Sequence, residues 1–175
     1  MIDVAIAYNR YKFLGHEFLT WLWYIIENTP KKITDADNNK VVLRIGNRLV
    51  LENKTDDNLE SIIIKGDAPG LEEGLLSLKK GAVVTEIDLL FQEGDYQWRF
   101  NIKGESLNVS GFKTPATGSV AQKDDVEGAV LEKIFLLEKP ILLIENLYEK
   151  FIKIKLSPTW KDETVQQIKK WIISQ

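Results

Sequence analysis

Apolar residues recur at helical spacing between about Phe13 and Asn28, in the stretch that contains "FLGHEFLTWLWY". On a helical wheel the aliphatic and aromatic side chains cover an arc of about 200°, wider than the single stripe of a surface helix. We therefore expect this helix to be buried on two sides, one of them against a sheet. The other side is expected to pack on a C-terminal helix with Trp160 and Trp171, because a chain of this size has enough elements to cover both. The alternative neighbour is another subunit.

Alternating apolar and polar positions predict antiparallel strands further along the chain. The segment 40–53, "KVVLRIGNRLVLEN", holds two short apolar runs around Gly46-Asn47, a pair that is typical of a hairpin turn. The segment 60–67, "ESIIIKGD", predicts a third strand. Residues 82–112 alternate through two turns, which predicts a three-strand antiparallel meander. A weaker alternation at 2–8 indicates one more short strand.

Two further stretches carry the signals of a short helix and of a loop. In "LEEGLLSLKKG", acids stand in the first turn, Lys79 and Lys80 in the last, and Gly81 follows them. This order is typical of a helix whose dipole is complemented by charge and whose end is capped by glycine. The polar, proline-bearing stretch near 113–125 predicts a flexible surface loop.

The C-terminal third of the chain is predicted to be largely helical. "AVLEKIFLLEK" (129–139) is compatible with a strand or a helix, and Pro140 fits the first turn of a new helix. Thr159 followed by Asp162 resembles a capping box at the start of the last helix. Strands and helices together predict an α+β fold, in which an antiparallel sheet packs with several α-helices in one domain over residues 1–175.

The composition of the 175 residues fits a globular domain, with 44% apolar and 28% charged residues. A net charge of −3 gives no general attraction to nucleic acid or anionic membranes, so such binding would need a local basic patch. The absence of cysteine excludes disulfides, cysteine-ligated metals and thiol catalysis, and it fits a reducing cytoplasm. The N-terminus does not resemble a signal peptide, and no apolar run approaches the ~20 residues of a membrane span. We therefore expect a cytoplasmic protein without a membrane partner.

The sequence offers little enzyme chemistry, and we expect a non-enzymatic protein without a metal or cofactor. The single histidine, His16, is interpreted as a polar residue at the edge of the first helix rather than as the base of a catalytic triad. "DADNN" at 35–39 begins like a calcium loop, but the positions of the required glycine and glutamate hold Lys40 and Gly46. Glycine motifs that bind phosphate or dinucleotides are absent.

One pattern leaves a catalytic alternative open. Glu52 and Lys54 form an E-x-K pattern, and Asp35 and Asp37 lie upstream. Such a set can hold Mg²⁺ and orient an attacking water when it converges in space. A Mg²⁺-dependent nuclease is therefore the lowest-ranked alternative, and a solvated strand end is the simpler interpretation of the same residues.

Lysines cluster locally in spite of the acidic total charge. Lys150, Lys153 and Lys155 stand close together, and Lys79 and Lys80 form a second pair. Contacts to phosphate need only such side chains, so these five lysines are the candidate DNA-binding residues. A solvated lysine face on amphipathic helices is the alternative interpretation.

Aromatic residues alternate with charge around Tyr96, Trp98 and Arg99, where exposed rings would stack on bases. Trp98 and Phe100 share one strand face, so we assign both to the core. Core packing is therefore the simpler interpretation of this stretch.

Three stretches, taken in order, resemble the C-terminal half of the recombination-associated protein RdgC family: "EFLTWLWY", "LEEGLLSLKKGAVVTEIDLLFQEGDYQWRFNIKGESLNVSGF" and "IFLLEKPILLIENLYEKF". The resemblance covers roughly residues 14–153 and consists of packing residues rather than a catalytic signature. That family forms bacterial ring-shaped dimers around duplex DNA, binds without sequence preference and restrains the RecA recombinase.

The resemblance implies a non-catalytic, sequence-independent DNA-binding protein associated with recombination, of bacterial or phage origin. Double-stranded DNA and a second copy of the chain are the implied partners. The first alternative is an interaction module that binds another protein and has no affinity for DNA. A single surface formed by the five candidate lysines would favour DNA, and lysines scattered among acids would favour the alternative.

Overall fold

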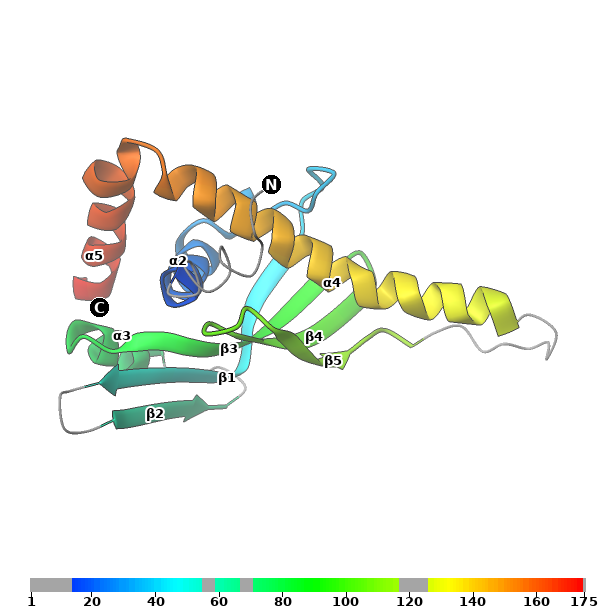
Figure 1. Ribbon diagram of the computed structural model, residues 1–175, viewed down its shortest axis with the longest axis horizontal. Helices are drawn as coiled ribbons and strands as arrows, with labels where there is room; N and C mark the ends of the chain where they lie inside the picture. Colours follow the sequence, from blue (N-terminus) through cyan, green and yellow to red (C-terminus); the bar gives the residue numbers. More distant parts are fainter. Residues whose placement is uncertain (1–13, 55–58, 67–70, 117–125, 175) are drawn as a thin grey trace, which may run out of the picture.

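The computed structural model describes residues 14–54, 59–66, 71–116 and 126–174. Its centre is a five-stranded antiparallel sheet with the strand order β2-β1-β3-β4-β5 (Figure 1). The strands are β1 (Val42–Lys54), β2 (Leu59–Lys65), β3 (Val83–Glu93), β4 (Tyr96–Lys103) and β5 (Val109–Lys113). Helices pack on this sheet, so the predicted α+β fold is confirmed.

The helical elements gather on one face of the sheet (Figure 1). They are α2 (Leu14–Asn28), the 3₁₀ turn η1 (Pro30–Lys32), α3 (Leu71–Lys79), α4 (Val126–Lys155), the π-helical turn η2 (Trp160–Thr164) and α5 (Val165–Ile173). The N-terminal end of α4 extends past the sheet (Figure 1). Within the described ranges, no helix has the length and apolarity needed to cross a lipid bilayer.

The wide apolar arc of α2 is buried by neighbours on more than one side. Phe18 meets Phe151 of α4 with ring centroids 5.6 Å apart, and Trp23 meets Trp171 of α5 at 5.2 Å. Another side of α2 packs on β3. The predicted burial on two sides within one chain is confirmed. Of the two tryptophans expected to cover α2, Trp171 contacts this helix, whereas the ring of Trp160 lies 5.6 Å from that of Phe151 in α4.

The close approach of α2 to the sheet depends on Gly15. A Cβ atom at this position would lie 1.8 Å from the carbonyl oxygen of Gly104, so a larger residue cannot occupy it without displacing the backbone. Gly104 is equally confined, because its added Cβ would lie 2.9 Å from His16 Nδ1. Two glycines thus let helix and sheet backbones meet, which brings the aromatic face of α2 into the core.

Several short elements lie where the sequence predicts them. The meander is β3-β4-β5, with Gly94 at φ 58° in its first turn. The third predicted strand is β2, and α3 is followed by Gly81 at φ 93°, as its C-cap pattern indicates. The strand predicted at 2–8 and residues 117–125 of the predicted loop lie outside the described residues.

The hairpin predicted at Gly46-Asn47 is wrong, because β1 runs through these residues without turning. The pairing of β1 with β3 shifts register between Ile45 and Leu49, as in a β-bulge. A Cβ at Gly46 would lie 1.9 Å from Asp88 Oδ2, so glycine here makes room for a side chain of β3. Gly46-Asn47, a residue pair typical of turns, therefore forms part of a β-bulge in this sheet.

Pro140 lies inside α4, so the prediction that it begins a new helix is wrong. Proline has no N–H for the carbonyl of the residue four positions earlier, which here is Leu136. Trp98 of β4 supplies the missing donor, since its Nε1–H donates to Leu136 O over 2.8 Å in a buried setting. The sheet therefore satisfies the carbonyl that the proline leaves open, and the helix continues.

The capping box predicted at Thr159 is also wrong. The Thr159 side chain makes no capping hydrogen bond, and its hydroxyl lies 2.8 Å from Ser157 Oγ instead. The chain enters the π-helical turn η2 and only then α5. Such turns widen the helical backbone by one residue and are frequent at functional sites.

Trp98→Phe is expected to lower the free energy of unfolding by about 2–3 kcal/mol, since it removes packing and the donor to Leu136 O. In a Pro140→Ala background, residue 140 has its own N–H for that carbonyl. The loss caused by Trp98→Phe should then shrink by about 1 kcal/mol. Urea unfolding of the four proteins of this double-mutant cycle measures the coupling. Losses that add within about 0.3 kcal/mol would contradict the role assigned to Trp98.

Candidate functional site

The sheet face that points away from the helices, here called the outer sheet face, concentrates positive charge. Cross-strand register places six basic and three acidic side chains of the described chain on it, a local charge of +3. The basic residues are Arg44, Arg48, Lys65, Arg99, Lys103 and Lys113, and the acidic residues are Glu52, Glu86 and Asp88. Every arginine that the structure describes belongs to this set.

Strand pairing aligns part of this charge in a row across the sheet. Arg44 of β1 pairs with Leu90 of β3. Leu90 pairs with Arg99 of β4, which pairs in turn with Lys113 of β5. Neighbouring strands are about 4.8 Å apart, so the row spans about 14 Å between its outer cations. Paired positions share one face of the sheet, so three cations point in the same direction.

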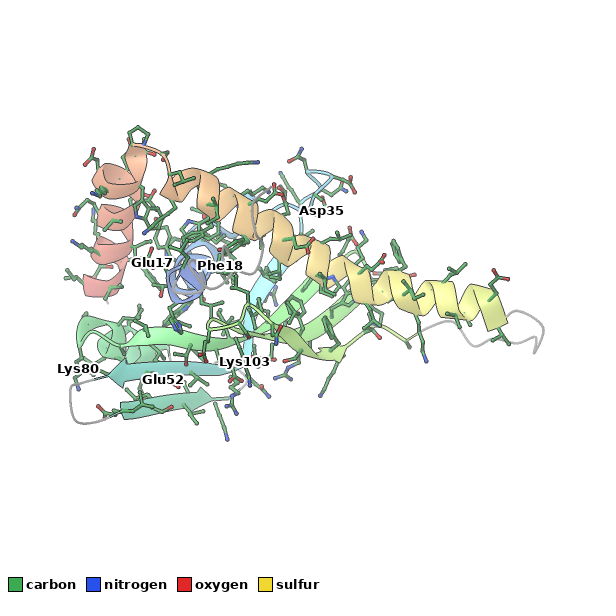
Figure 2. All side chains as sticks on the ribbon, viewed as in Figure 1. Glu17, Phe18, Asp35, Glu52, Lys80 and Lys103 are labelled. Carbon is green, nitrogen blue, oxygen red and sulfur yellow. The ribbon has the colours of Figure 1, made fainter. Side chains whose placement is uncertain are left out.

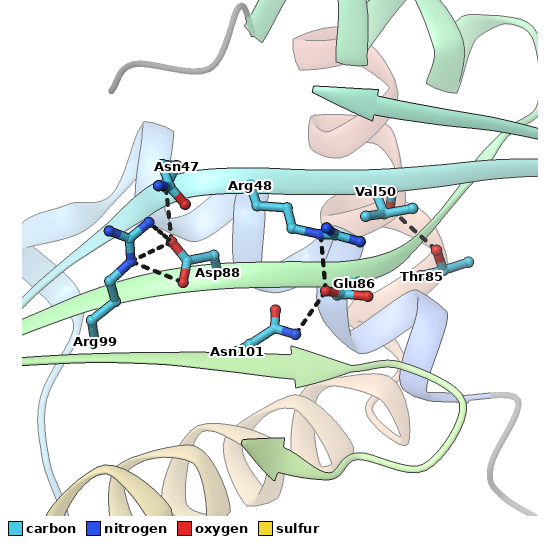
Figure 3. Close-up of polar contacts among 8 residues, drawn as sticks. All are labelled: Asn47, Arg48, Val50, Thr85, Glu86, Asp88, Arg99 and Asn101. Atoms are coloured by element: carbon cyan, nitrogen blue, oxygen red, sulfur yellow. Dashed lines mark hydrogen bonds and ion pairs between the residues drawn. The ribbon is translucent and has the colours of Figure 1, made fainter. Parts of the chain in front are cut away.

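Asp88 fixes the central cation of this row. Its Oδ2 accepts from Arg99 Nε at 2.9 Å and Nη2 at 2.7 Å, and the backbone N–H of Asn47 donates to the same oxygen over 2.8 Å (Figure 3). Asp88 is only 8% exposed, and a buried carboxylate needs such donors. Gly46 in the bulge of β1 makes room for this carboxylate, and the carboxylate holds Arg99. The position of Arg99 therefore depends on the bulge.

A second network holds Arg48. Its Nε lies 3.0 Å from Glu86 Oε1, which also accepts from Asn101 Nδ2 over 2.8 Å (Figure 3). Two arginines of the outer sheet face are thus held by acids within the sheet. The four other cations are exposed, and none of them forms an ion pair with a described residue: Arg44, Lys65, Lys103 and Lys113. These four are available to an anionic partner.

The five lysines singled out by the sequence lie in two groups. Lys79 and Lys80 are at the C-terminal end of α3, and the others are at the C-terminal end of α4, with α5 between these ends (Figure 1). Each lysine of the second group has an intramolecular contact: Lys150 with Thr34, Lys153 with Glu149, and Lys155 with Glu17. DNA binding by these five stays a prediction, and the outer sheet face presents more exposed cations on one surface.

The residues of the nuclease alternative do not converge. Asp35 lies in a turn near α4, whereas Glu52 lies at the distant end of β1 (Figure 2). Asp35 Oδ1 is occupied by its own turn, because it accepts from the backbone N–H groups of Asp37 and Asn39 at 2.9 and 2.8 Å. The side chain of Lys54 lies outside the described residues. In the part of the chain that the structure describes, no three acidic or histidine side chains are placed to hold a metal ion.

Asp35 is held as a carboxylate in that turn. Burial by itself raises the pKa of this group, but hydrogen bonds from Asn39 and Asp37 and the charge of Lys139 outweigh it, so the pKa lies below its ordinary value. A lowered pKa contributes stability above the unfolded-state value of about 3.9, and this is lost as the pH falls through the folded-state pKa. Asp35 therefore anchors the turn before β1 at neutral pH.

His16 lies at the junction of α2 with β3. It is half-buried, and its Nδ1 is 3.0 Å from the carbonyl oxygen of Val84, to which a protonated Nδ1 donates. This contact ties the helix to the sheet. The position agrees with the interpretation of His16 as an edge residue with a packing role.

The arginines of the outer sheet face do not form a run along the chain, so the local charge pattern does not mark them as one surface. Arg44 and Lys113 are 69 positions apart, and only strand register brings them into one row. A usable signal existed in the meander, where Arg99 and Lys103 occupy the polar positions that alternate with buried Trp98 and Phe100. Reading the outward positions of every predicted strand together would have found part of the set.

Comparison of this chain with protein-family models, with curated proteins and with solved structures gives no match. The resemblance to the RdgC family therefore stays a prediction.

Asp88→Asn is expected to lower the free energy of unfolding by about 2 kcal/mol, because it removes the charge that holds Arg99. Glu93→Gln is the matched control. Its partner Lys139 lies at 2.8 Å, close to the 2.7 Å between Arg99 and Asp88, but both side chains are about a quarter exposed. The expected loss is therefore below about 1 kcal/mol. Urea unfolding at pH 7 measures both variants. Equal losses would argue against a special structural role for Asp88.

Proposed function

We propose that this chain binds double-stranded DNA through the outer sheet face, without catalysis and without sequence preference. The observation that carries the proposal is the cross-strand row of Arg44, Arg99 and Lys113, with exposed Lys65 and Lys103 on the same face. Phosphate groups bind side chains of this kind. The resemblance to the RdgC family implies the same activity and an association with recombination.

The shape of the face favours contacts to phosphate over contacts to bases. The major groove of B-DNA is about 12 Å wide and admits an α-helix or a two-stranded ribbon. Five strands side by side span about 19 Å, so the sheet lies against the duplex rather than inside its groove. Contacts to the backbone carry no sequence information, and we therefore expect binding that ignores sequence.

The distribution of charge orients the molecule on a polyanion. The chain has a net charge of −3, and the outer sheet face has +3, so the rest of the chain carries −6. A duplex attracts the one face and repels the remainder. An acidic total charge is therefore compatible with binding through this single surface.

We expect a labelled 20-base-pair duplex to bind the protein. The logarithm of the affinity should fall with the logarithm of the salt concentration with a slope of about −4, because four exposed cations meet phosphates. Replacing Arg44, Lys103 and Lys113 together with glutamine should reduce the steepness by about 3. The affinity at 50 mM salt should fall at least tenfold. Fluorescence anisotropy across a salt series measures both quantities.

The control removes the same number of charges from the helical side, by changing Lys79, Lys80 and Lys153 to glutamine. Its salt slope should equal that of the unchanged protein. Loss of binding in this control alone would move the interface to the lysines predicted from the sequence. Absence of binding by the unchanged protein at 50 mM salt would overturn the DNA proposal. Strand cleavage that appears with Mg²⁺ would contradict a non-catalytic role.

A specific feature of α4 also favours a protein partner. Val130, Ile134, Leu137 and Ile141 follow one another at spacings of four, three and four residues, and each is 38–50% exposed. These four residues, here called the α4 stripe, lie in the N-terminal part of α4, whose end extends past the sheet (Figure 1). Apolar residues at this spacing are what a second helix covers in a coiled coil.

A second copy of the chain is the partner that the α4 stripe fits. Lys133 and Glu138 flank the stripe on opposite sides and stand five positions apart. In two parallel helices that share such a stripe, side chains with this spacing meet across the interface as an opposite-charge pair. We infer a parallel pairing of α4 helices, in which the Lys133 of each copy faces the Glu138 of the other.

The unchanged protein is expected to dimerise at tens of micromolar, and Leu137→Glu to remain monomeric, since it places a charge within the apolar contact. Glu138→Lys should weaken the dimer about tenfold by placing two cations together. Adding Lys133→Glu to that variant should restore the affinity, because the pair is again of opposite charge. Light scattering coupled to size exclusion measures the mass of each protein. A monomer at 100 µM, or no rescue by the double exchange, would rule out this pairing.

A further inference from the structure

A groove on the helical side of the molecule combines an apolar floor with a cationic rim. It has a volume of about 410 Å³ and lies between α2, η1, α4 and the start of α5. This size is within the range of small-molecule sites, about 300–1,000 Å³. The groove is on the opposite side of the sheet from the outer sheet face, so its role is separable from DNA binding.

Large apolar side chains form the floor of this groove. Trp21 of α2 and Leu147 of α4 are buried beneath it, and Ile25 and Ile154 are half-buried along it. The hydroxyl of Tyr24 donates to Gln167 Oε1 over 3.2 Å across one end, which links α2 to α5. The floor thus offers an apolar body a preformed surface between three helices.

Three lysines from two elements form the rim. Lys32 of η1 and Lys153 of α4 are exposed, and Lys150 of α4 is half-buried. Lys153 Nζ also lies 3.6 Å from Glu149 Oε2, in an ion pair of two exposed side chains. Lys150 Nζ donates to Thr34 Oγ1 over 2.7 Å, so one ammonium group has a fixed position. A groove with three cations at its edge and an apolar floor has the complementary chemistry of a ligand with one anionic end.

The charged form of Lys150 at the rim is disfavoured by its surroundings, and a bound anion would stabilise it. Burial lowers the pKa of Lys150, the charge of Asp35 raises it, and the charge of Lys153 lowers it again, with a net lowering. The neighbouring charge thus adds to burial in disfavouring the protonated form of Lys150. An anionic group beside Lys150 would favour its charged form.

A local irregularity of the backbone contributes to the same groove. Thr164, the last residue of the π-helical turn η2, lines it, while Trp160 at the other end of the turn lines a separate hollow. The extra residue of a π turn re-aims side chains and is frequent where ligands bind. The turn thus adds a residue with a hydroxyl group to the lining of the groove.

We propose that this groove binds a small amphipathic anion, an aromatic or acyl body that ends in one carboxylate, phosphate or sulfonate group. The apolar body lies on the floor beside Trp21 and Ile154, and the anionic group lies at the lysine rim. Recognition depends on both parts, so a neutral compound of the same shape binds more weakly.

The test uses two fluorescent probes that differ in charge, 1-anilinonaphthalene-8-sulfonate and its uncharged parent N-phenyl-1-naphthylamine. The sulfonate is expected to bind the full chain at least tenfold more tightly than the parent. The double variant Lys32→Glu/Lys153→Glu should remove that preference, because it reverses two charges of the rim and leaves the floor unchanged. Lys161→Glu/Lys170→Glu, two charge reversals at exposed lysines that do not line the groove, is the control and should keep the preference.

Competition identifies the class of ligand within this chemistry. Displacement of the sulfonate probe by laurate would assign an acyl anion, and displacement by 1-naphthyl phosphate would assign an aromatic one. Equal affinity for the two probes would overturn the proposal, as would full retention of the preference in the double variant. Circular dichroism of each variant confirms that it is folded. Duplex binding of the double variant, measured as above, should be unchanged, which separates failure here from failure of the DNA proposal.

Discussion

The buried hydrogen bond from Trp98 to the carbonyl of Leu136 is the constraint on which the rest of the structure depends. It joins β4 to α4, at the turn where Pro140 removes a helical donor. A helix with an unsatisfied buried carbonyl would be expected to kink or end there. Because the indole supplies the donor, α4 runs for 30 residues, with its C-terminal part over α2 and its N-terminal end past the sheet (Figure 1).

This placement of α4 divides the molecule into surfaces with different chemistry. Its C-terminal half covers Phe18 and, with α5, encloses the aromatic core on one face of the sheet. All described helices are used on that face, so the other face is left to the charged networks of Asp88 and Glu86 (Figure 3). Towards its N-terminal end, α4 exposes the apolar α4 stripe. The placement of α4 therefore leaves three distinct surfaces: a cationic sheet face, an apolar helix stripe and a lysine-rimmed groove.

Local patterns were sufficient where a segment's surroundings agree with its own periodicity. Four elements were predictable from the sequence: the helix around "EFLTWLWY", the meander, β2 and α3. A helix or strand that buries one face has apolar residues at a regular spacing, and this spacing is visible in the sequence. The predictions were wrong at Gly46, Pro140 and Thr159. Each of them assumed the local role that the residue type usually has, as a turn, a helix start or a helix cap. At Gly46 the room is taken by Asp88 from another strand, and at Pro140 the missing donor comes from Trp98. In both cases a partner distant in sequence changed the outcome.

By itself, the sequence determined the fold class, the burial of α2 and the core positions of Trp98 and Phe100, because these depend on apolar periodicity within short segments. It also limited the chemistry, since a chain without cysteine and with one histidine has few catalytic or metal-binding options. Only the tertiary structure decided which charges share a surface. Arg44, Arg99 and Lys113 meet through strand register, and Lys32 reaches Lys150 and Lys153 through the packing of η1 beside α4. Charges attract partners by their distances in space, and those distances are set by pairing and packing rather than by order along the chain.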